Sequence, residues 1–396
     1  MMLTILRAVA GLLALALIGT AHAAEPYRTE GDCDGFPKLD LKTAPGLCVG
    51  LVAEHLGFAR GVAAVGADIY VLDMGGWRKG KGRLLHLGDR GHAAATVSLS
   101  GLDEPSAILA LPDGRLLVGE LGQVSVLDPR QTPLALEKVA SGLPRDGLHP
   151  LSALALTADG TLFLNSGSAS DHCEHADGSP PDPHLPCPET LLPLPRAALF
   201  SLPLAGGDAV PFARGLRNSM ALALLPGGQL VAAVNARDAI NRADPALSDE
   251  TLPHDTLVLV KKGADYGWPY CFDDNRRSPE YPDFDCGSRE KPTLLLPAHA
   301  APLGMVFYRD QRLPGLKAHL IIAYHGYREN GHRIVALAVG ADGSLQGAPR
   351  EIVGGWAREA GHHPQGAPVA LAVMEDGSLL VTEDHNQTLL RVSVER

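Results

Sequence analysis

Four short polar segments carry the side chains best suited to chemistry. They read Gly147-Leu-His149, Gly215-Leu-Arg217-Asn218-Ser219, Asn235-Ala236-Arg237-Asp238 and His254-Asp255-Thr256. A histidine titrates near neutral pH and can act as a general base, and a carboxylate can orient its imidazole and stabilise the cation. An arginine fork binds carboxylates well, and an asparagine can donate to a carbonyl. Together these groups could bind a polar ligand and remove a proton from it.

The elements that must position these segments follow a repeat. In its full form it is a Pro or small residue, an alternating apolar run, a D-G turn and a second apolar run, which is typical of two strands joined by a tight turn. Six copies begin at Phe58, Glu104, Pro150, Asn218, Pro302 and Ala367. One such unit cannot bury both of its faces, whereas units packed radially cover one another. The sequence therefore predicts an all-β, six-bladed β-propeller with loop insertions; a β-sandwich or a single large barrel is the alternative.

Long insertions interrupt this repeat. They span residues 165–196, 234–257, 262–297 and 325–332. In propellers the loops at one end of the central channel form the binding site, so the chemistry is expected there.

The N-terminus has the features of an export signal. One positive side chain, an apolar run over residues 8–19 and the sequence Ala21-His22-Ala23 follow one another, as in a secretory signal peptide. An uncleaved membrane anchor is the alternative. We expect a signal peptide at 1–23, an N-terminal segment at 24–50 that contains Cys33 and Cys48, and the propeller at 51–396. The protein would be periplasmic or secreted.

Six cysteines form three local pairs in the sequence. They are Cys33 and Cys48, Cys173 and Cys187, and Cys271 and Cys286. In an exported chain an even number of cysteines predicts disulfides, and each nearest-neighbour pair brackets one loop-like segment. A zinc site is the alternative, although no pair has the tight C-x₂-C spacing.

The charge balance limits the partners. The net charge of −11 argues against nucleic acid and against an anionic membrane surface. No second apolar run is long enough to span a bilayer, so no membrane span is expected in the mature chain.

The order and spacing of the polar segments resemble those of the glucose/sorbosone dehydrogenase family. Residues 215–219 resemble the family's G-x-R-N-P, 235–238 its N-G-R-D, and 263–269 its G-x-N-Y-G-W-P. Residues 301–308 resemble its A-P-L-G-x-x-F-Y, and 147–149 its G-x-H. The resemblance runs from about Gly57 to the C-terminus. It implies an exported dehydrogenase that oxidises an aldose or related alcohol and passes hydride to pyrroloquinoline quinone (PQQ), with a sugar substrate and a periplasmic electron acceptor as partners.

The resemblance also implies residue roles. His149 matches the family's general base, and Asp255 matches the carboxylate that orients this base. Arg217 and Asn218 match cofactor contacts, and Arg328 is a further candidate cation for the cofactor. In the same way, Ala236 and Arg237 match positions whose backbone carbonyls ligate Ca²⁺.

The sequence also departs from the family pattern. Ala367 stands where the family has an arginine that would bind a PQQ carboxylate, and losing such a charge-assisted contact costs about 1.5–3 kcal/mol. Arg358, His362 or His363 could replace it. These departures favour, as one alternative, a binding propeller that has lost PQQ. A metal-dependent lactonase is the other alternative, because four polar residues end blade strands: Asp73, Glu120, Asn235 and Glu383.

Overall fold

A computed structural model describes residues 27–356 and 366–396 of the chain. The expected signal peptide at 1–23 lies outside the described residues, as do Arg358, His362 and His363. Within these ranges the chain consists mainly of strands, joined by turns and a few 3₁₀ segments. The 3₁₀ segments are η1 (Asp89–Gly91), η2 (Pro188–Thr190), η3 (Pro226–Gly228), η4 (Ile240–Arg242) and η5 (Cys286–Ser288).

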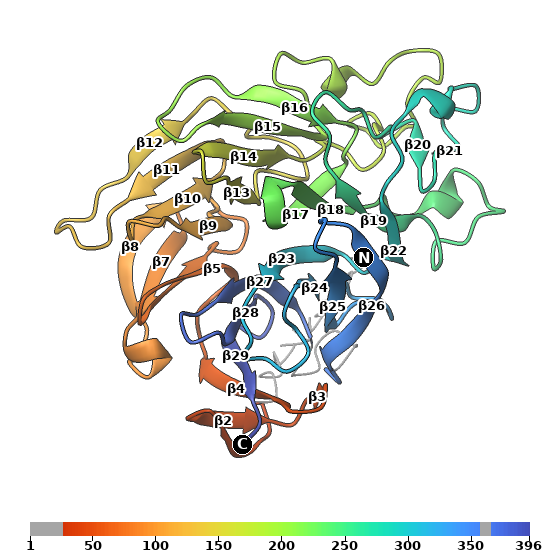
Figure 1. Ribbon diagram of the computed structural model, residues 1–396. Helices are drawn as coiled ribbons and strands as arrows, with labels where there is room; N and C mark the ends of the chain where they lie inside the picture. Colours follow the sequence, from red (N-terminus) through yellow and green to blue (C-terminus); the bar gives the residue numbers. More distant parts are fainter. Residues whose placement is uncertain (1–26, 357–365) are drawn as a thin grey trace, which may run out of the picture.

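The strands form six antiparallel sheets arranged in a ring, which confirms the predicted six-bladed β-propeller (Figure 1). Blade 1 contains β5 (Ala59–Val65), β6 (Asp68–Asp73), β7 (Gly82–Leu87) and β8 (Thr96–Leu102). Blade 2 contains β9 (Ala107–Ala110), β10 (Leu116–Glu120), β11 (Gln123–Leu127) and β12 (Glu137–Ala140). Blade 3 contains β13 (Leu154–Leu156), β14 (Thr161–Ser166), β15 (Ala198–Pro203) and β16 (Val210–Arg214).

The second half of the ring follows the same plan. Blade 4 contains β17 (Asn218–Leu224), β18 (Leu230–Asn235), β19 (His254–Leu259) and β22 (Leu294–Ala298). Blade 5 contains β23 (Pro302–Tyr308), β24 (His319–Tyr324), β25 (Arg333–Val339) and β26 (Leu345–Gly354). Blade 6 contains β27 (Pro368–Val373), β28 (Leu379–Glu383) and β29 (Thr388–Val394). A small hairpin of β20 (Cys271–Phe272) and β21 (Arg276–Arg277) lies in the loop between β19 and β22.

The D-G turns form the hairpins as the repeat predicts. In the turn before β10, Gly114 has φ of 85°, a left-handed conformation that costs glycine little. The Asp113 carboxylate accepts from the backbone N–H of Arg115 at 3.0 Å, which fixes this turn. Each inner strand contacts that of the next blade, and β27 contacts β5, so that the ring closes.

The N-terminal part of the chain completes blade 6. Strand β4 (Leu47–Ala53) pairs with β29 along its length, and β2 (Phe36–Leu39) and β1 (Thr29–Cys33) extend the sheet (Figure 1). Strand β3 (Lys42–Thr43) pairs with the end of β26 in blade 5. The expected division between residues 50 and 51 therefore falls inside β4, and residues on both sides of it belong to the propeller.

The core lies between neighbouring blades. Alternate side chains of each sheet point to opposite faces, and apolar residues occupy both faces of the inner strands. Between blades 5 and 6, for example, Tyr308, Ile321, Leu379 and Val381 form one buried cluster. Because burying one such side chain stabilises the fold by about 1.5–3 kcal/mol, each interface holds its two blades firmly together.

Three disulfides join nearest neighbours, as the sequence predicts. They are Cys33–Cys48, Cys173–Cys187 and Cys271–Cys286. The first ties β1 to β4 in blade 6, and the other two close loops on the insertions after β14 and β19. Each of these two disulfides thereby restrains its loop.

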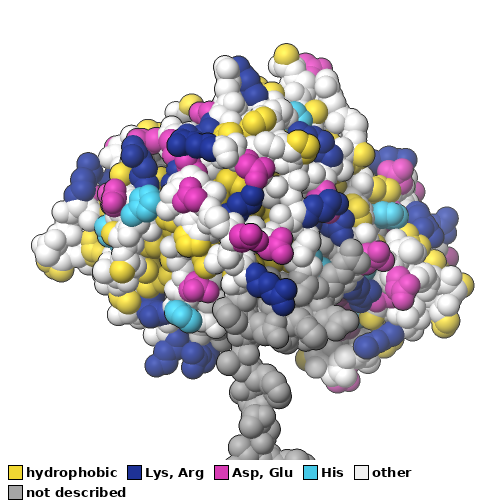
Figure 2. Space-filling model, turned by 90° about the horizontal axis from the view of Figure 1, so that it is seen from below, with side chains coloured by type: hydrophobic (Ala, Val, Ile, Leu, Met, Phe, Trp, Pro, Cys, Tyr) yellow, Lys and Arg dark blue, Asp and Glu magenta, His cyan; other side chains and the backbone are white. Residues whose placement is uncertain are grey.

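In the face shown in Figure 2, basic and acidic side chains are interspersed rather than gathered in one basic stripe. In the described part of the chain, no helix has the length and apolar character to cross a membrane.

Glu383 makes the closure of blade 6 sensitive to pH. Its fully buried carboxylate accepts from the hydroxyls of Tyr27 at 2.5 Å and Thr388 at 2.6 Å, and from the Asn386 amide at 3.1 Å. Burial raises the pKa of Glu383 to about 7. The folded state therefore holds this proton more tightly than the unfolded state does.

The Glu383 contribution to the free energy of unfolding should be complete below the unfolded pKa of about 4.3 and should be lost as pH rises through about 7. At about 1.4 kcal/mol for each unit of pKa difference, the loss by pH 8 is roughly 4 kcal/mol. Glu383→Gln should flatten the dependence of Tm on pH between 5 and 8, measured by calorimetry. An unchanged slope would contradict this assignment.

Candidate active site at the channel mouth

A cavity of about 480 Å³ opens at one end of the channel, where all six blades contribute residues. Small-molecule sites typically measure about 300–1,000 Å³. The polar lining consists of Arg60, Ser106, His149, Ser152, Asn218, Asn235, His325, Tyr327, Asp384 and His385. Phe58, Met74, Trp77, Leu148 and Met220 supply much of the apolar lining.

His149 is held in one tautomer on the blade 3 side of this cavity. Its Nδ1 lies 3.0 Å from the carbonyl oxygen of Ser168 and 2.9 Å from the Ser168 hydroxyl. Since a carbonyl can only accept, Nδ1 carries the hydrogen and Nε2 keeps its lone pair. Burial and the nearby Arg217 guanidinium lower the pKa of His149 to about 3. The imidazole is therefore neutral at any pH near neutrality and can accept a proton at Nε2.

Two asparagines beside His149 have unpartnered oxygens. Asn218 begins β17, Asn235 ends β18, and the two residues pair across the hairpin. The two residues are 3% and 9% exposed, and within the described residues neither Oδ1 has a hydrogen-bond partner. A buried polar atom without a partner costs about 1–3 kcal/mol. Ligand hydroxyls or a bound cation would remove this cost.

The opposite wall carries a charge network that the sequence analysis missed. Arg60 is buried, and its Nη1 lies 2.6 Å from Asp384 Oδ2. The guanidinium also lies 5.4 Å from the Phe58 ring centroid and 5.7 Å from that of Trp77. The sequence contained one signal for this network. Arg60 is a charged residue in the first inner strand, where the other copies of the repeat are mostly apolar.

Arg217 lies behind the cavity rather than in its lining. Its Nε donates to the Asp171 carbonyl at 2.9 Å, its Nη1 donates to the Asn235 carbonyl at 3.2 Å, and its Nη2 pairs with the Asp171 carboxylate. Burial opposes this carboxylate's charge, but His172 and Arg217 hold the pKa of Asp171 well below its ordinary value. Arg217 thus braces the strand of Asn218 against the disulfide-closed loop.

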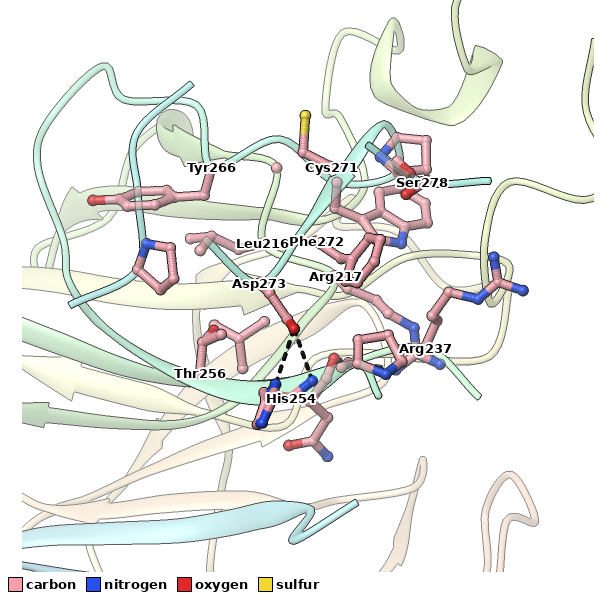
Figure 3. A pocket seen from close by; sticks show the side chains of 18 of the residues that line it. Leu216, Arg217, Arg237, His254, Thr256, Tyr266, Cys271, Phe272, Asp273 and Ser278 are labelled. Carbon is pink, nitrogen blue, oxygen red and sulfur yellow. Dashed lines mark hydrogen bonds and ion pairs between the residues drawn. The ribbon is translucent and has the colours of Figure 1, made fainter. Parts of the chain in front are cut away.

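Arg217 and Arg237 both border a second, smaller cavity of about 70 Å³ (Figure 3). Arg237 is buried and donates to Glu280 at 2.5 Å. In the same view His254 is bonded to Asp273, through its backbone N–H at 2.8 Å and its Nδ1 at 2.9 Å. At about 70 Å³ this cavity is too small for a ligand of cofactor size, whereas the channel mouth is not.

Asp255 does not contact His149. Its Oδ1 accepts from the backbone N–H of Ala236 and its Oδ2 from that of Ala301, both at 2.7 Å. Burial raises the pKa of this carboxyl to about 6. Asp255 therefore joins the loop after β18 to the start of blade 5, and Ser168 takes the orienting position that was expected for Asp255.

The remaining predicted residues fall on the loops around the cavity. Ala236 donates to Asp255 and, with Arg237, follows the cavity-lining Asn235. Arg328 does not line the channel-mouth cavity: its guanidinium pairs with Asp249, donating to the backbone oxygen at 2.6 Å and contacting the carboxylate at 2.7 Å. It thus joins the loop after β24 to the loop after β18.

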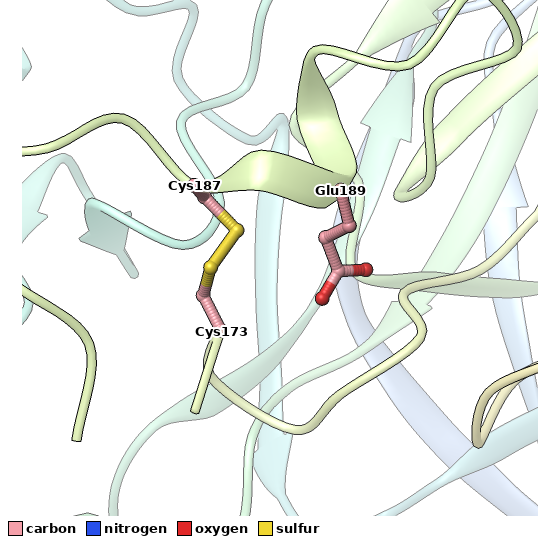
Figure 4. Close-up of side chains that lie close together, drawn as sticks. All are labelled: Cys173, Cys187 and Glu189. Atoms are coloured by element: carbon pink, nitrogen blue, oxygen red, sulfur yellow. A yellow bond between two sulfur atoms is a disulfide. The ribbon is translucent and has the colours of Figure 1, made fainter. Parts of the chain in front are cut away.

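Cys173, Cys187 and Glu189 also lie close together, but they do not form a metal site (Figure 4). Both sulfurs belong to a disulfide, whereas metals bind thiolates. The Glu189 carboxylate bonds the backbone N–H of Ala169 at 2.5 Å and also the Ser170 hydroxyl. It therefore holds the segment after β14 that carries Ser168.

Comparisons with known proteins agree with this architecture. A carbohydrate-active enzyme of family AA12 from Trichoderma reesei superposes with a TM-score of 0.70 over 93% of this chain and 100% of its own, at 18% identity. The PQQ domain of a pyranose dehydrogenase from Coprinopsis cinerea gives 0.68 over 91% and 99%, at 17% identity. A PQQ-bound aldose sugar dehydrogenase from Streptomyces coelicolor gives 0.60 over 89% and 100%, at 16% identity. At these identities the likeness establishes the shared propeller fold.

Sequence comparisons are less informative. No protein-family model matches the chain. An uncharacterised protein of Borreliella burgdorferi is 26% identical over 212 residues, which are 52% of this chain and 54% of that protein. The chain thus spans about half the length of the curated relative that it matches.

Asp255→Asn tests the structural role of Asp255. An asparagine can satisfy only one of the two backbone N–H groups with its oxygen, and its own NH₂ would face the other. We expect the free energy of unfolding to fall by about 1–3 kcal/mol, measured by denaturant titration. Asp113→Asn at an exposed turn is the control and should change little. Equal stabilities of wild type and Asp255→Asn would exclude this role.

Proposed function

We propose that the protein is a periplasmic or secreted PQQ-dependent dehydrogenase that oxidises an aldose or a related alcohol. The observation that carries the proposal is His149, a neutral base with a fixed tautomer in a cavity of cofactor size. The shared fold of the pyranose and aldose sugar dehydrogenases supports it. The unpartnered oxygens of Asn218 and Asn235 further indicate that the cavity receives a polar ligand.

The residues at the channel mouth fit PQQ, an ortho-quinone with three carboxylates. Arg60 uses one N–H for Asp384 and has others for a ligand carboxylate, and it occupies the same cavity wall as the aromatic rings. Arg60 would thus supply the positive charge that the family's arginine provides at the position of Ala367. Asn218 would contact the quinone from the other wall. Ca²⁺ would bind beside Asn235, with the carbonyls of Ala236 and Arg237 as oxygen ligands.

The mechanism assigned to this chain is a proton transfer. When bound, PQQ supplies the hydride acceptor. His149 accepts the proton of the substrate hydroxyl at Nε2 as the C–H bond breaks, while Nδ1 keeps its hydrogen on the Ser168 carbonyl. Asp171 favours the imidazolium that forms, because its negative charge raises the pKa of His149. The walls of the cavity hold the sugar and keep water away from the reacting carbon.

The low pKa of His149 determines the acid side of the pH profile. A base that titrates at about 3 remains unprotonated throughout the working range. We expect kcat/KM for an aldose to show no loss attributable to His149 between pH 5 and 8, in an assay with PQQ, Ca²⁺ and a dye acceptor. A fall in kcat/KM toward acid pH with a midpoint near 6.5, in a protein that remains folded, would contradict this assignment.

His149→Gln tests the base directly. Glutamine retains much of the shape but cannot take the proton, so kcat should fall by about 10²–10⁴-fold while PQQ binding persists. The matched control is His319→Gln at the other end of blade 5, which should keep its activity. Full activity of His149→Gln would exclude the proposed mechanism, and absence of turnover in the reconstituted wild type on any aldose or related alcohol would exclude the proposed function.

A further inference from the structure

A cluster of two imidazoles and one carboxylate lies across the cavity from His149. His325 follows β24 in blade 5, and Asp384 and His385 follow β28 in blade 6. In a closed ring of six blades, blade 6 faces blade 3, which positions His149. The nitrogens and carboxylate oxygen that the cluster offers all lie within 4.8 Å of one another. His325 and Asp384 are buried, whereas His385 reaches the surface.

Hydrogen bonds connect the members of this cluster. His325 Nε2 lies 3.0 and 3.2 Å from the two Asp384 oxygens, and the Tyr327 hydroxyl lies 3.2 Å from the same nitrogen and 2.5 Å from His385 Nε2. Since the ionised carboxylate only accepts, Nε2 of His325 carries a hydrogen, and Tyr327 donates its own to His385. The Nε2 atoms of the two histidines and the Asp384 carboxylate therefore lie close together. The hydrogen on His325 Nε2 and the hydroxyl hydrogen of Tyr327 link them.

We propose that His325, Asp384 and His385 bind one divalent transition-metal ion of the Zn²⁺ type. Two imidazole nitrogens and one carboxylate are a common donor set for zinc and for neighbouring metals, whereas Ca²⁺ and Mg²⁺ prefer oxygen ligands. The ion takes the place of the hydrogen on His325 Nε2, which moves to Nδ1 of the same ring, and it displaces the Tyr327 hydroxyl from His385. Three protein ligands leave a coordination position open toward the cavity.

The surroundings of Asp384 would position the carboxylate for this ion. Arg60 holds Oδ2 at 2.6 Å, and the backbone N–H of His385 donates to Oδ1 at 2.8 Å. The contact from the His385 backbone, which does not depend on Arg60, orients the carboxylate as outer contacts of metal ligands do. The positive charge of Arg60 opposes a second cation, so this residue should restrain the affinity. We therefore expect two opposite effects: removal of a ligand weakens metal binding, and removal of the Arg60 charge strengthens it.

The test is a calorimetric titration of the mature protein, without PQQ, with Zn²⁺, accompanied by the visible spectrum of Co²⁺. We expect one saturable equivalent. Asp384→Asn and His385→Ala should each weaken binding by more than about tenfold, because loss of an outer-shell contact alone costs about 10–100-fold. Arg60→Met should bind Zn²⁺ more tightly than the wild type. Exposed His385 can be replaced without disturbing the core, so that loss of folding does not obscure this result.

His319→Ala is the matched control, because this histidine lies at the other end of β24 and should leave Zn²⁺ binding unchanged. The proposal is wrong if Zn²⁺ binding is not saturable, or if His385→Ala binds Zn²⁺ as tightly as the wild type. The titration is made without PQQ, so its outcome does not depend on the dehydrogenase activity.

Discussion

The pairing of β4 with β29 is the interaction on which the rest of the structure depends. A propeller blade has two apolar faces, and each face needs a neighbouring blade to cover it. Each of the first five blades takes its four main strands from one stretch of the chain. The sixth obtains its fourth strand, β4, from the N-terminal part of the chain, which pairs with β29 near the C-terminus. The backbone ladder, the Cys33–Cys48 disulfide and the buried contacts of Glu383 with Tyr27 hold this closure. Without it, blades 1 and 6 would expose their facing sides.

Ring closure also assembles the candidate active site. Arg60 and Asp384 are 324 residues apart in sequence and meet only because β27 packs against β5. His149 and Asn218 reach the same cavity from blades 3 and 4. The two walls differ in charge: on one side a neutral imidazole stands beside two amide oxygens, and on the other an arginine, a carboxylate and two further imidazoles form a network. A ligand that contains both anionic groups and hydroxyls can satisfy both walls.

Local patterns explain what could be predicted from the sequence. The six hairpins were predictable because an alternating apolar run and a D-G turn each need only neighbouring residues. His149 and Asn218 were predictable as cavity residues because they lie just before or at the start of inner strands. The partners of Asp255 and Arg328 were not, since they depend on loops that meet from 46 and 79 residues away. The N-terminal strands carry no copy of the repeat, so their place in blade 6 could not be inferred.

A dehydrogenase of the proposed kind must bind PQQ at the channel mouth. Calorimetric titration of the purified protein with PQQ, with and without Ca²⁺, is the decisive measurement. We expect saturable binding that Ca²⁺ strengthens and that Asn218→Ala and Arg60→Met each weaken. No binding at any accessible PQQ concentration, or binding that neither substitution alters, would exclude a PQQ site at the channel mouth. It would favour a propeller that uses this cavity for recognition or for metal-dependent hydrolysis.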